Sequence, residues 1–560
     1  MLSVPARAAV LGALFAALVT LPALGVGTLW DNSETAYGEV AREVVGTHDW
    51  VVLHLNGQPW FVQPPLYFWI AALFAKVFGV SALALRLPSA LATIAMGGAV
   101  GYATARIAGG RAGMVAAIVL STSLMQAIVG RLAIMDALLD FAVAAAVLWW
   151  FRAFEPSGTP RRRAVALVSG ALALGLGTLA KGPVAPVITI LIVGVWACWE
   201  MRAGRLAAPT RRAVLLALGA YLVVTLPWFI ALAVRVGPPA LGELIGHYTI
   251  GRYTGVIENQ RGPIWYYLPV VILGFFPWIA FLPAAARAAW REARGADGAF
   301  ARLALVWAIV PFVFFSFADT KLPNYIALLL PALAILVALW FERVAAGAEH
   351  RAAIVSAASV PVFIGCVALA LALFARTNNL DVYAAAVGPQ LLFLGGAMLA
   401  GSLLTVATIA RGATLAWSPY VLALTSGALI LFISFVAEPA AERLKPIPPI
   451  ARAIDAAAVR GDLVALRGVS GVNGLIFYTR PPVLDIADGR ASFLAAACSA
   501  PAAWIVVRPD NAAQLEGEVR AVGRRAAIVA QGPFEGPPRA LLLHVDGPPC
   551  QAAAARGGGR

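Results

Sequence analysis

The sequence predicts an α-helical polytopic membrane protein that ends in a small C-terminal α/β domain. Of its 560 residues, 61% are hydrophobic and only 12% are charged, and the mean hydropathy is +0.83. Apolar runs long enough to cross a bilayer recur over residues 1–436. Backbone polar groups inside a bilayer must be satisfied within the segment, so these runs are expected to be helices. The mixed composition of residues 437–560 indicates a domain outside the membrane.

The positive charge of the chain is concentrated in short turns between the apolar runs. A formal net charge of +14 alone would suit a nucleic-acid-binding protein, but arginines in such turns are typical of membrane topology. We therefore expect no nucleic-acid partner and assign the arginine-rich turns to the cytoplasm. These turns lie at residues 106–111, 152–163, 202–212, 287–302, 343–351 and 411.

About thirteen apolar runs are compatible with this topology, and an odd number places the C-terminus outside. They cover roughly residues 8–29, 87–105, 112–130, 137–151, 164–180, 184–200, 213–234, 264–286, 303–318, 323–341, 352–374, 389–410 and 416–436.

The first outer loop is predicted to cover residues 30–86 and to contain two short helices. The apolar run 65–79 is too short for a span, and counting it as one would place the later arginines outside. We expect it to lie along the membrane surface, together with a short amphipathic helix at 34–45.

Residues 437–560 contain short β-rich runs separated by helical stretches, which is the pattern of an α/β domain. The helices are expected at 449–459 and 511–522, and the tail AAAARGGGR is expected to be disordered. The strands are expected at 462–468, 474–479, 502–507, 525–531 and 539–545.

Ionisable residues from several separate loops fall on the outer side of this topology. Such groups are costly at membrane depth and usually face a polar cavity or a partner. Together they suit transfer from a lipid-linked phosphate, in which a carboxylate acts as base and cations bind the departing phosphate. The residues outside the first loop are Asp136, Lys181, His247, Arg252, Lys321, Asn324 and Tyr325.

The stretch LWDNSETAYGEVAREVV (29–45) adds Asp31, Glu34 and Tyr37 to this side. Each has a structural alternative, because Asp31 and Glu34 are spaced as an N-cap pair and Tyr37 could anchor at the interface. Asp136 could form an ion pair with Arg131, and Lys181 and Lys321 could extend from span ends to the membrane surface.

Several blocks of the sequence resemble bacterial glycosyltransferases of the C fold, in the aminoarabinose transferase and protein O-mannosyltransferase superfamily. The blocks occur in the family's order and cover roughly residues 10–340. They are SETAYGEVAREVVGTHDWVVLHLNGQPWFVQPPLYFW (33–69), RLPSAL (86–91), GRLAIMDALLDF (130–141), LAKGPVA (179–185), GPIWYYLPVVILGFFPW (262–278) and TKLPNYIALLLPALA (320–334).

The resemblance implies the glycosyltransferase C fold and an inverting transferase that uses a polyprenyl-phosphate sugar donor. The acceptor would be lipid A, another glycolipid or a protein, at the outer face of the bacterial inner membrane, with membrane lipids as further partners. Carried over, Glu34 is the base and Asp136 orients the acceptor or the base, while Asp31, two residues before the family's usual acidic position, could substitute as base. Lys181, Lys321 and Arg252 would neutralise the lipid phosphate, and Tyr37 and Asn324 would contact sugar or phosphate. His247 and Tyr325 are further substrate-binding candidates, and the matches of His247 and Arg252 to the family are the less secure ones.

This chain departs from the family pattern in its first loop. Ser33 and Ala36 stand where the family commonly has Asp and Arg, and Val62-Gln63 stands where it commonly has Glu-Lys. No cofactor is required by these roles, and a divalent metal held by His247 with Glu34 or Glu258 is left open.

Two other functions remain as alternatives. A transporter or flippase of lipid-linked or polar solutes would place broken or polar helices near the bilayer midplane, which the sequence does not show clearly. An inactive binding subunit would fit the missing first-loop residues. Incubation with polyprenyl-phosphate sugars separates transfer, transport and binding.

Overall fold

The computed structural model describes most of the chain. Its described residues are 2–30, 33–257, 260–377, 381–410, 417–459, 462–467, 472–479, 483–485, 498, 502–533 and 539–547.

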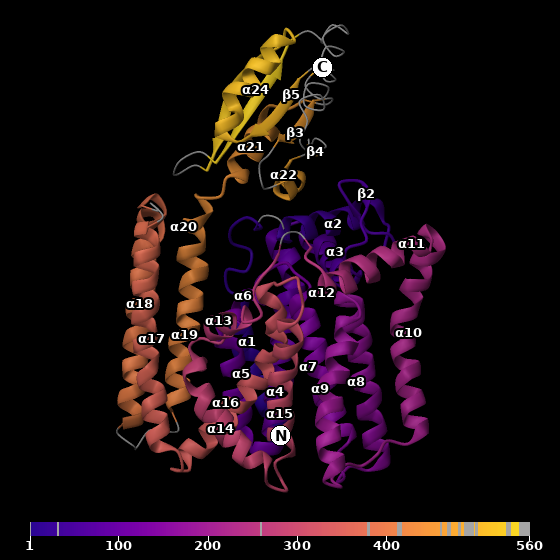
Figure 1. The fold of residues 1–560 in the computed structure, drawn as a ribbon, viewed down its shortest axis with the longest axis vertical. Coiled ribbons are helices and arrows are strands. Elements are labelled where there is room, and N and C mark those ends of the chain that lie inside the picture. Colours follow the sequence, from indigo (N-terminus) through magenta and orange to yellow (C-terminus); the bar gives the residue numbers. More distant parts are fainter. Residues whose placement is uncertain are drawn as a thin grey trace.

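A helical bundle makes up the first four fifths of the protein, and the C-terminal domain lies at one end of it (Figure 1). The helices of the bundle are α1 (Val4–Thr20), α2 (Ser33–Thr47), α3 (Leu66–Phe78), α4 (Ala82–Ala108), α5 (Gly110–Thr122), α6 (Leu124–Val129), α7 (Asp136–Ala153), α8 (Pro160–Lys181), α9 (Val184–Arg202), α10 (Arg211–Val236), α11 (Pro238–Leu241), η1 (Gly242–Gly251), α12 (Arg252–Thr254), α13 (Tyr267–Gly274), η2 (Trp278–Phe281), α14 (Leu282–Ala293), α15 (Ala299–Ser316), η3 (Pro323–Leu329), α16 (Leu330–Ala345), α17 (His350–Thr377), α18 (Asp381–Ala410), α19 (Ser418–Phe432), η4 (Ile433–Ala437) and α20 (Glu438–Glu442). A short antiparallel hairpin follows α2, and each of its strands, β1 (His54–Leu55) and β2 (Gln58–Pro59), has two residues.

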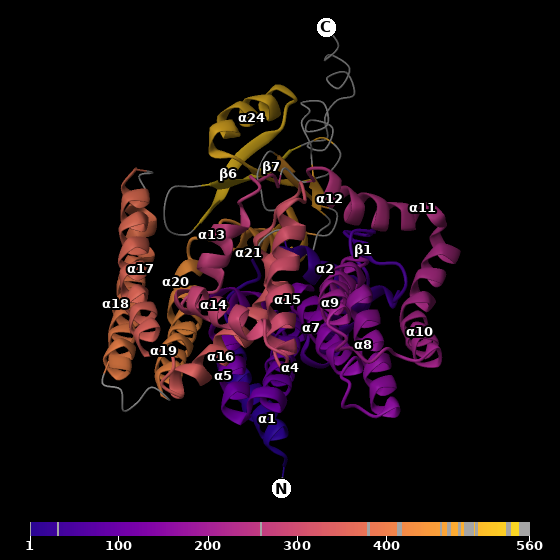
Figure 2. The same cartoon turned by 60° about the horizontal axis from the view of Figure 1, so that its bottom comes forward.

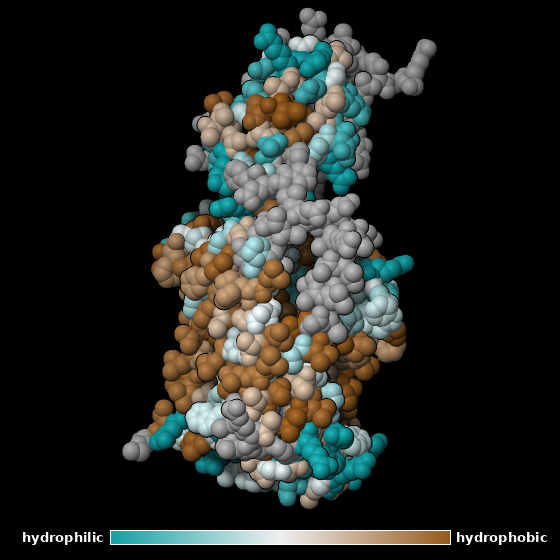
Figure 3. Space-filling view, turned by 90° about the vertical axis from the view of Figure 1, so that its left-hand side faces the viewer, coloured by the Kyte–Doolittle hydropathy of each residue, from teal (hydrophilic) through white to brown (hydrophobic). Residues whose placement is uncertain are grey.

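The protein is a multi-pass membrane protein. Among the described residues, seven helices are long and apolar enough to cross a membrane, or eight if the bent pair at 267–293 is counted as one span. Each of the thirteen predicted runs overlaps a helix, but several of these helices are shorter than a full span, and in the run 8–29 helix α1 ends at Thr20. Figure 3 shows a hydrophobic surface over the middle of the bundle, with hydrophilic residues at the end opposite the C-terminal domain.

One predicted span is wrong in detail. Residues 264–286 were expected to form one continuous helix, but Tyr267–Gly274 and Trp278–Ala293 meet at an angle of 106°. Pro277, between the two segments, has no N–H to continue the helical hydrogen bonds. The backbone carbonyl of Phe276 instead accepts a hydrogen bond from the amide of Leu124, at 3.1 Å.

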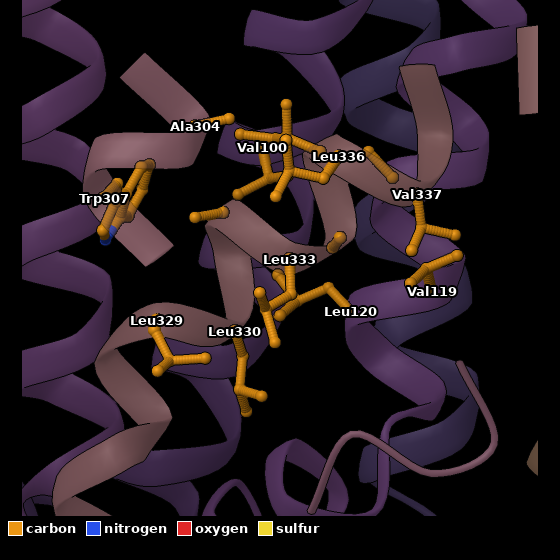
Figure 4. Close-up of a cluster of buried hydrophobic side chains, with 14 of the residues drawn as sticks. Val100, Val119, Leu120, Ala304, Trp307, Leu329, Leu330, Leu333, Leu336 and Val337 are labelled. Carbon is orange, nitrogen blue, oxygen red and sulfur yellow. The ribbon is translucent and has the colours of Figure 1, made fainter. Parts of the chain in front are cut away.

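Helix α16 lies in the centre of the bundle and is buried along nearly its whole length. Leu333, Leu336 and Val337 contact side chains of α4, α5 and α15 (Figure 4). A helix that is apolar all round is expected to be buried in this way. Helices α17–α19 lie on one side of this centre, and α8–α10 lie on the other (Figures 1 and 2).

Close contacts between α1, α4 and α5 depend on small residues. A Cβ atom added to Gly113 would lie 2.5 Å from the Cβ of Ala105, and one added to Gly12 would lie 2.7 Å from that of Ala117. Small residues let membrane helices approach closely and increase their van der Waals contact.

The C-terminal domain is built on a five-stranded mixed sheet. Strand β3 is parallel to β4 and β5, whereas β7 is antiparallel to β5 and β6, in the order β4-β3-β5-β7-β6. Helix α24 packs on one face, and α21 and α22 pack on the other. The elements are α21 (Ile447–Ala457), β3 (Leu463–Arg467), α22 (Val472–Tyr478), β4 (Val483–Asp485), β5 (Ala503–Val507), α24 (Pro509–Ala521), β6 (Arg525–Gly532) and β7 (Ala540–Asp546).

Four of the five predicted strands of this domain are confirmed, but the strand predicted at 474–479 is wrong. These residues belong to helix α22, because a short apolar run fits either structure and tertiary contacts decide between them. Arg42 of α2 donates hydrogen bonds to the carbonyls of Ile476 and Phe477, near the end of α22.

The helices predicted at 34–45 and 65–79 are confirmed as α2 and α3. The predicted tail at 552–560 lies outside the described residues.

Candidate active site

A cavity of about 1540 Å³ lies where the helical bundle meets the C-terminal domain. Its walls come from segments far apart in the chain, including α2, the start of α7, the end of α8, the 248–260 segment, η3 and α20. Most of the lining is apolar. The hydrogen-bonding and charged residues of the lining are Ser33, Glu34, Tyr37, Trp60, Gln63, Arg86, Arg131, Asp136, Asp140, Lys181, Tyr248, Thr249, Arg252, Tyr253, Gln260, Asn324, Tyr325, Ser434, Glu438 and Asn473, with Trp30 beside them.

Asp136 is the centre of one polar cluster in this cavity. Its Oδ1 accepts hydrogen bonds from Lys181 Nζ at 2.5 Å and from Asn324 Nδ2 at 2.7 Å. The Lys181 ammonium also lies 5.0 Å from the centre of the Tyr325 ring. Helices α7 and α8 are antiparallel neighbours, so the first residue of one and the last residue of the other meet at the same end. The structure therefore brings together four of the predicted site residues.

Asp136 does not pair with Arg131. Arg131 Nη1 instead donates to the carbonyl of Thr20 at 2.6 Å and to that of Val19 at 3.4 Å. Asp140 lies one turn beyond Asp136 and is 2% exposed, so it lies deeper in the wall.

Glu34 lines the cavity, but both of its carboxylate oxygens are engaged by donors. Arg86 binds them in a two-point ion pair, from Nε to Oε1 and from Nη2 to Oε2, each at 3.0 Å. The amides of Trp30 and Ala133 also donate to this carboxylate, at 2.8 and 2.5 Å. Arg86 further contacts Glu438 Oε1 at 3.5 Å. This network joins α2, α4, α20 and the segment before α7, and it suits Glu34 to anchoring the first loop.

Tyr37 lies one turn after Glu34 and also lines the cavity. Its ring packs edge-on against Trp60 and Phe68, with centroid distances of 6.1 and 5.8 Å. The structure thus places an aromatic wall beside the ionic groups.

Arg252 reaches the cavity from the opposite side. Its Nη1 donates to Gln260 Oε1 at 3.4 Å, and its guanidinium lies 5.8 Å from the centre of the Tyr248 ring. Backbone hydrogen bonds join the segments that carry these residues to the segment 319–321. The amide of Thr320 donates to the carbonyl of Arg252, and the amide of Lys321 donates to the carbonyl of Gln260.

Lys321 and His247 are not part of the cavity lining. The Lys321 ammonium donates to the carbonyls of Phe315, Ser316 and Ala318 at the end of α15. Burial lowers the pKa of Lys321 from its usual value, and attraction to Asp319 opposes that shift. Through these contacts Lys321 caps the C-terminal end of α15, whose last carbonyls would otherwise lack hydrogen-bond donors. The His247 side chain is exposed and packs edge-on against Tyr248.

Two predicted groups cannot be located, because Asp31 and Glu258 lie outside the described residues. Among the residues that are described, no group of three or more His, Cys, Asp and Glu side chains is placed to hold a metal ion.

Sequence reasoning missed several charged residues of the cavity wall. Arg86 and Glu438 were not selected, although an arginine inside an apolar helix is itself a signal of function or pairing. Arg131 was considered only as a structural partner of Asp136. Asn473 comes from the C-terminal domain, whose sequence offered no motif that would connect it with the cavity.

Comparisons with known proteins give one consistent family. Residues 62–230 match the model of the dolichyl-phosphate-mannose-protein mannosyltransferase family. An undecaprenyl phosphate-alpha-4-amino-4-deoxy-L-arabinose arabinosyl transferase of Edwardsiella ictaluri is 32% identical over 317 residues, or 56% of each chain. The chain thus spans little more than half the length of this relative.

A longer alignment is found with the undecaprenyl phosphate-alpha-4-amino-4-deoxy-L-arabinose arabinosyl transferase 1 of Sodalis glossinidius, at 30% identity over 428 residues, or 75% of each chain. Among solved structures, ArnT from Cupriavidus metallidurans, bound to undecaprenyl phosphate, has the same fold, with a TM-score of 0.77 and 24% identity. That similarity covers 96% of this chain and 97% of the other. The chain belongs to the family of the undecaprenyl phosphate-alpha-4-amino-4-deoxy-L-arabinose arabinosyl transferases.

Proposed function

We propose that this protein transfers a glycosyl group from a polyprenyl-phosphate-linked sugar to an acceptor at the outer membrane face. The observation that carries the proposal is the cavity itself, in which the Asp136 cluster and Arg252 share walls with apolar side chains. Such a site suits a ligand with a polar sugar phosphate and a long hydrocarbon chain. The family relatives support the same reaction class, since their names describe transfer from undecaprenyl phosphate.

In the proposed reaction an oxygen of the acceptor attacks the anomeric carbon of the donor sugar. The bond from that carbon to the phosphate oxygen breaks, and its electron pair leaves with the polyprenyl phosphate. Asp136 orients the acceptor or accepts its proton, while Lys181 and Arg252 stabilise the charge on the phosphate. Tyr37, Asn324 and Tyr325 lie beside these groups and are suited to hydrogen bonds with sugar or phosphate.

Glu34 fits this scheme better as an anchor than as a base, because four donors already hold its carboxylate. Asp31 remains an alternative base from the sequence. Lys321 is proposed to support the Arg252 segment through its backbone contact with Gln260. These roles require no cofactor, and a divalent metal bound with His247 remains a separate prediction that chelation would test.

For the substrates, we propose aminoarabinose carried by undecaprenyl phosphate as donor and lipid A as acceptor. The names of the relatives support this donor. An anionic glycolipid would reach the cavity from the membrane, as would the donor lipid, because many of the lining residues are apolar and come from spanning helices. Another glycolipid or a protein acceptor remains the alternative.

We further propose thirteen membrane crossings in the bacterial inner membrane, with the cavity and the C-terminal domain on the periplasmic side. The arginine-rich turns support this orientation. Figure 1 shows the turns between α7 and α8 and between α9 and α10 at the end opposite the C-terminal domain.

The test is to incubate purified protein in lipid vesicles with undecaprenyl phosphate-aminoarabinose and lipid A, and to follow the product by mass spectrometry. The expected result is one added sugar mass on lipid A. Asp136→Asn should reduce the rate, whereas Asp510→Asn on the exposed surface of α24 should not. Movement of intact donor across the vesicle membrane without product would instead identify a flippase and overturn the proposal.

A further inference from the structure

Four cationic side chains line the cavity, and three of them have partners that account for their charge or position. Arg86 is bound by Glu34 and Glu438, and Lys181 is bound by Asp136. Arg252 contacts Gln260 and the Tyr248 ring. The fourth is Arg131, in the turn between α6 and α7.

Arg131 is held by backbone carbonyls rather than by a carboxylate. Its Nη1 donates to Thr20 and Val19, whose carbonyls lie in the last turn of α1 and would otherwise lack partners. In the described part of the chain, no carboxylate lies within 4.0 Å of this guanidinium. Arg131 lines the cavity, and within the described ranges neither its Nε nor its Nη2 donates a hydrogen bond. The side chain is therefore fixed at one nitrogen and still has donors available.

The surroundings of Arg131 make a second anion favourable. Ala127 of α6 and Ile430 of α19 pack with Val19, whose carbonyl Arg131 binds, and both line the cavity with apolar side chains. Burial lowers the pKa of Arg131, attraction to Glu438 opposes this shift, and repulsion from Arg86 adds to it. Arg131 is half-buried, and a partly desolvated charge without a close counter-ion is costly, so a bound anion would remove part of that cost.

Arg131 and Arg252 belong to different sides of the cavity. Both ribbon views show α19 and α20 toward one side of the bundle and α12 toward the other (Figures 1 and 2). Arg131 follows α6 and binds the carbonyl of Val19, which packs with Ile430 of α19, whereas Arg252 begins α12. One anion near Arg252 would leave the donors of Arg131 available for another.

We propose that Arg131 binds a phosphate group carried by a lipid at the α6–α19 side of the cavity. This inference rests on the proposed function and adds a second anion site to it. Arginine suits the role because its planar guanidinium can present two parallel N–H donors to a phosphate. The phosphate belongs either to the acceptor glycolipid or to the polyprenyl donor, and the two sources are separated by experiment.

The experiment uses the full chain in lipid nanodiscs and the variants Arg131→Gln and Arg131→Lys. Arg235→Gln is the matched control, since Arg235 is an outer arginine that pairs with Asp49 and does not line the cavity. Binding is followed by tryptophan fluorescence, because Trp30 and Trp60 line the cavity. The probes are undecaprenyl phosphate, lipid A and dephosphorylated lipid A.

We expect Arg131→Gln to weaken the binding of one phosphorylated probe about ten- to hundredfold, as for the loss of charge-assisted hydrogen bonds. Arg131→Lys should recover part of that affinity, and Arg235→Gln should bind as the wild type does. A loss confined to lipid A, and absent for its dephosphorylated form, assigns the site to the acceptor. A loss confined to undecaprenyl phosphate assigns it to the donor.

Unchanged affinity of Arg131→Gln for both phosphorylated probes would overturn the inference. So would equal weakening for lipid A with and without its phosphates, because the effect would then not depend on phosphate. Failure of both Arg131 variants to give folded protein would assign the residue to the fold and overturn the binding role. These readouts need no turnover, so a wild type that binds both probes but transfers no sugar would remove the proposed function and leave the anion site.

Discussion

Glu34 and Arg86 form a two-point ion pair in which the side chains are 1% and 2% exposed. The pair connects α2 with α4. Because neither group is hydrated, each depends on the other and on the neighbouring backbone groups for compensation of its charge.

Removing one partner of this pair should destabilise the protein strongly. We expect Glu34→Ala or Arg86→Ala to cost about 3–5 kcal/mol, since the remaining charge stays buried without its partner. Thermal unfolding in detergent measures the effect. The double variant Glu34→Leu with Arg86→Met should recover much of the loss, and a double variant as unstable as the sum of the single ones would contradict this reasoning.

Asp136 and Lys181 should act as one unit in catalysis. Asp136→Asn and Lys181→Met are each expected to lower kcat at least about tenfold while folding normally. Their effects should not add in the double variant, because either change breaks the same contact. Steady-state kinetics with fixed donor checks this, and fully additive losses would show that the two residues act independently.

Lys321 should matter for stability more than for chemistry. Its ammonium binds three carbonyls near the end of α15, so Lys321→Met should reduce the yield and melting temperature of the protein. Activity per folded molecule should stay within a few-fold of wild type. Lys321→Arg keeps a donor for the carbonyls and serves as the comparison. A well-folded Lys321→Met protein without turnover would show that this lysine acts in substrate binding or catalysis.

Asp49 should give the protein a stability contribution that depends on pH. Burial favours a raised pKa, but hydrogen bonds from Arg235, Val52 and Val51 outweigh it and hold the pKa of Asp49 below its usual value of 3.8. The contribution is therefore present above that value and is lost as the pH falls through the lower, folded-state pKa. Melting curves of wild type and Asp49→Asn should differ at neutral pH and converge in acid. An equal difference in melting temperature at every pH would show that the Asp49 carboxylate does not cause the pH dependence of stability.

Gly113 should be required for the contact between α4 and α5. An added Cβ would lie 2.5 Å from the Cβ of Ala105, so Gly113→Ala must push the helices apart and lower the melting temperature. Gly194→Ala is the control, because nothing lies within 4 Å of its added Cβ and alanine favours helix. Equal stability of the two variants would show that the α4–α5 contact tolerates an added methyl group.

The helices were predictable because a run of apolar residues has one stable structure in a membrane. Residues 65–79 could be recognised as a short helix because the run is apolar but too short to cross the membrane. The break at Gly274–Trp278 was harder to predict, since Pro277 lies within an otherwise continuous apolar run and some membrane helices contain proline. The run 474–479 was assigned to a strand because its helix depends on contacts with α2, which lies more than 400 residues earlier.

Part of the cavity could be predicted because charged residues near membrane ends are few. Asp136, Lys181, Asn324 and Tyr325 do meet there. The partners of each charge could not be predicted, since they depend on how the helices pack. Glu34 therefore looked like an available base, although Arg86 and two amides hold it, and Lys321 looked like a phosphate ligand, although it binds carbonyls.

The junction between the first loop and the C-terminal domain has a consequence for biosynthesis. The Leu29 amide donates to the Tyr478 hydroxyl at 2.6 Å, and Arg42 binds the end of α22. A ribosome makes the first loop early and Tyr478 more than 400 residues later. Leu29 and Arg42 therefore lack these partners until nearly the whole polypeptide has been made, and a product truncated before α22 would keep its membrane helices but lack the part of the cavity wall that Asn473 provides.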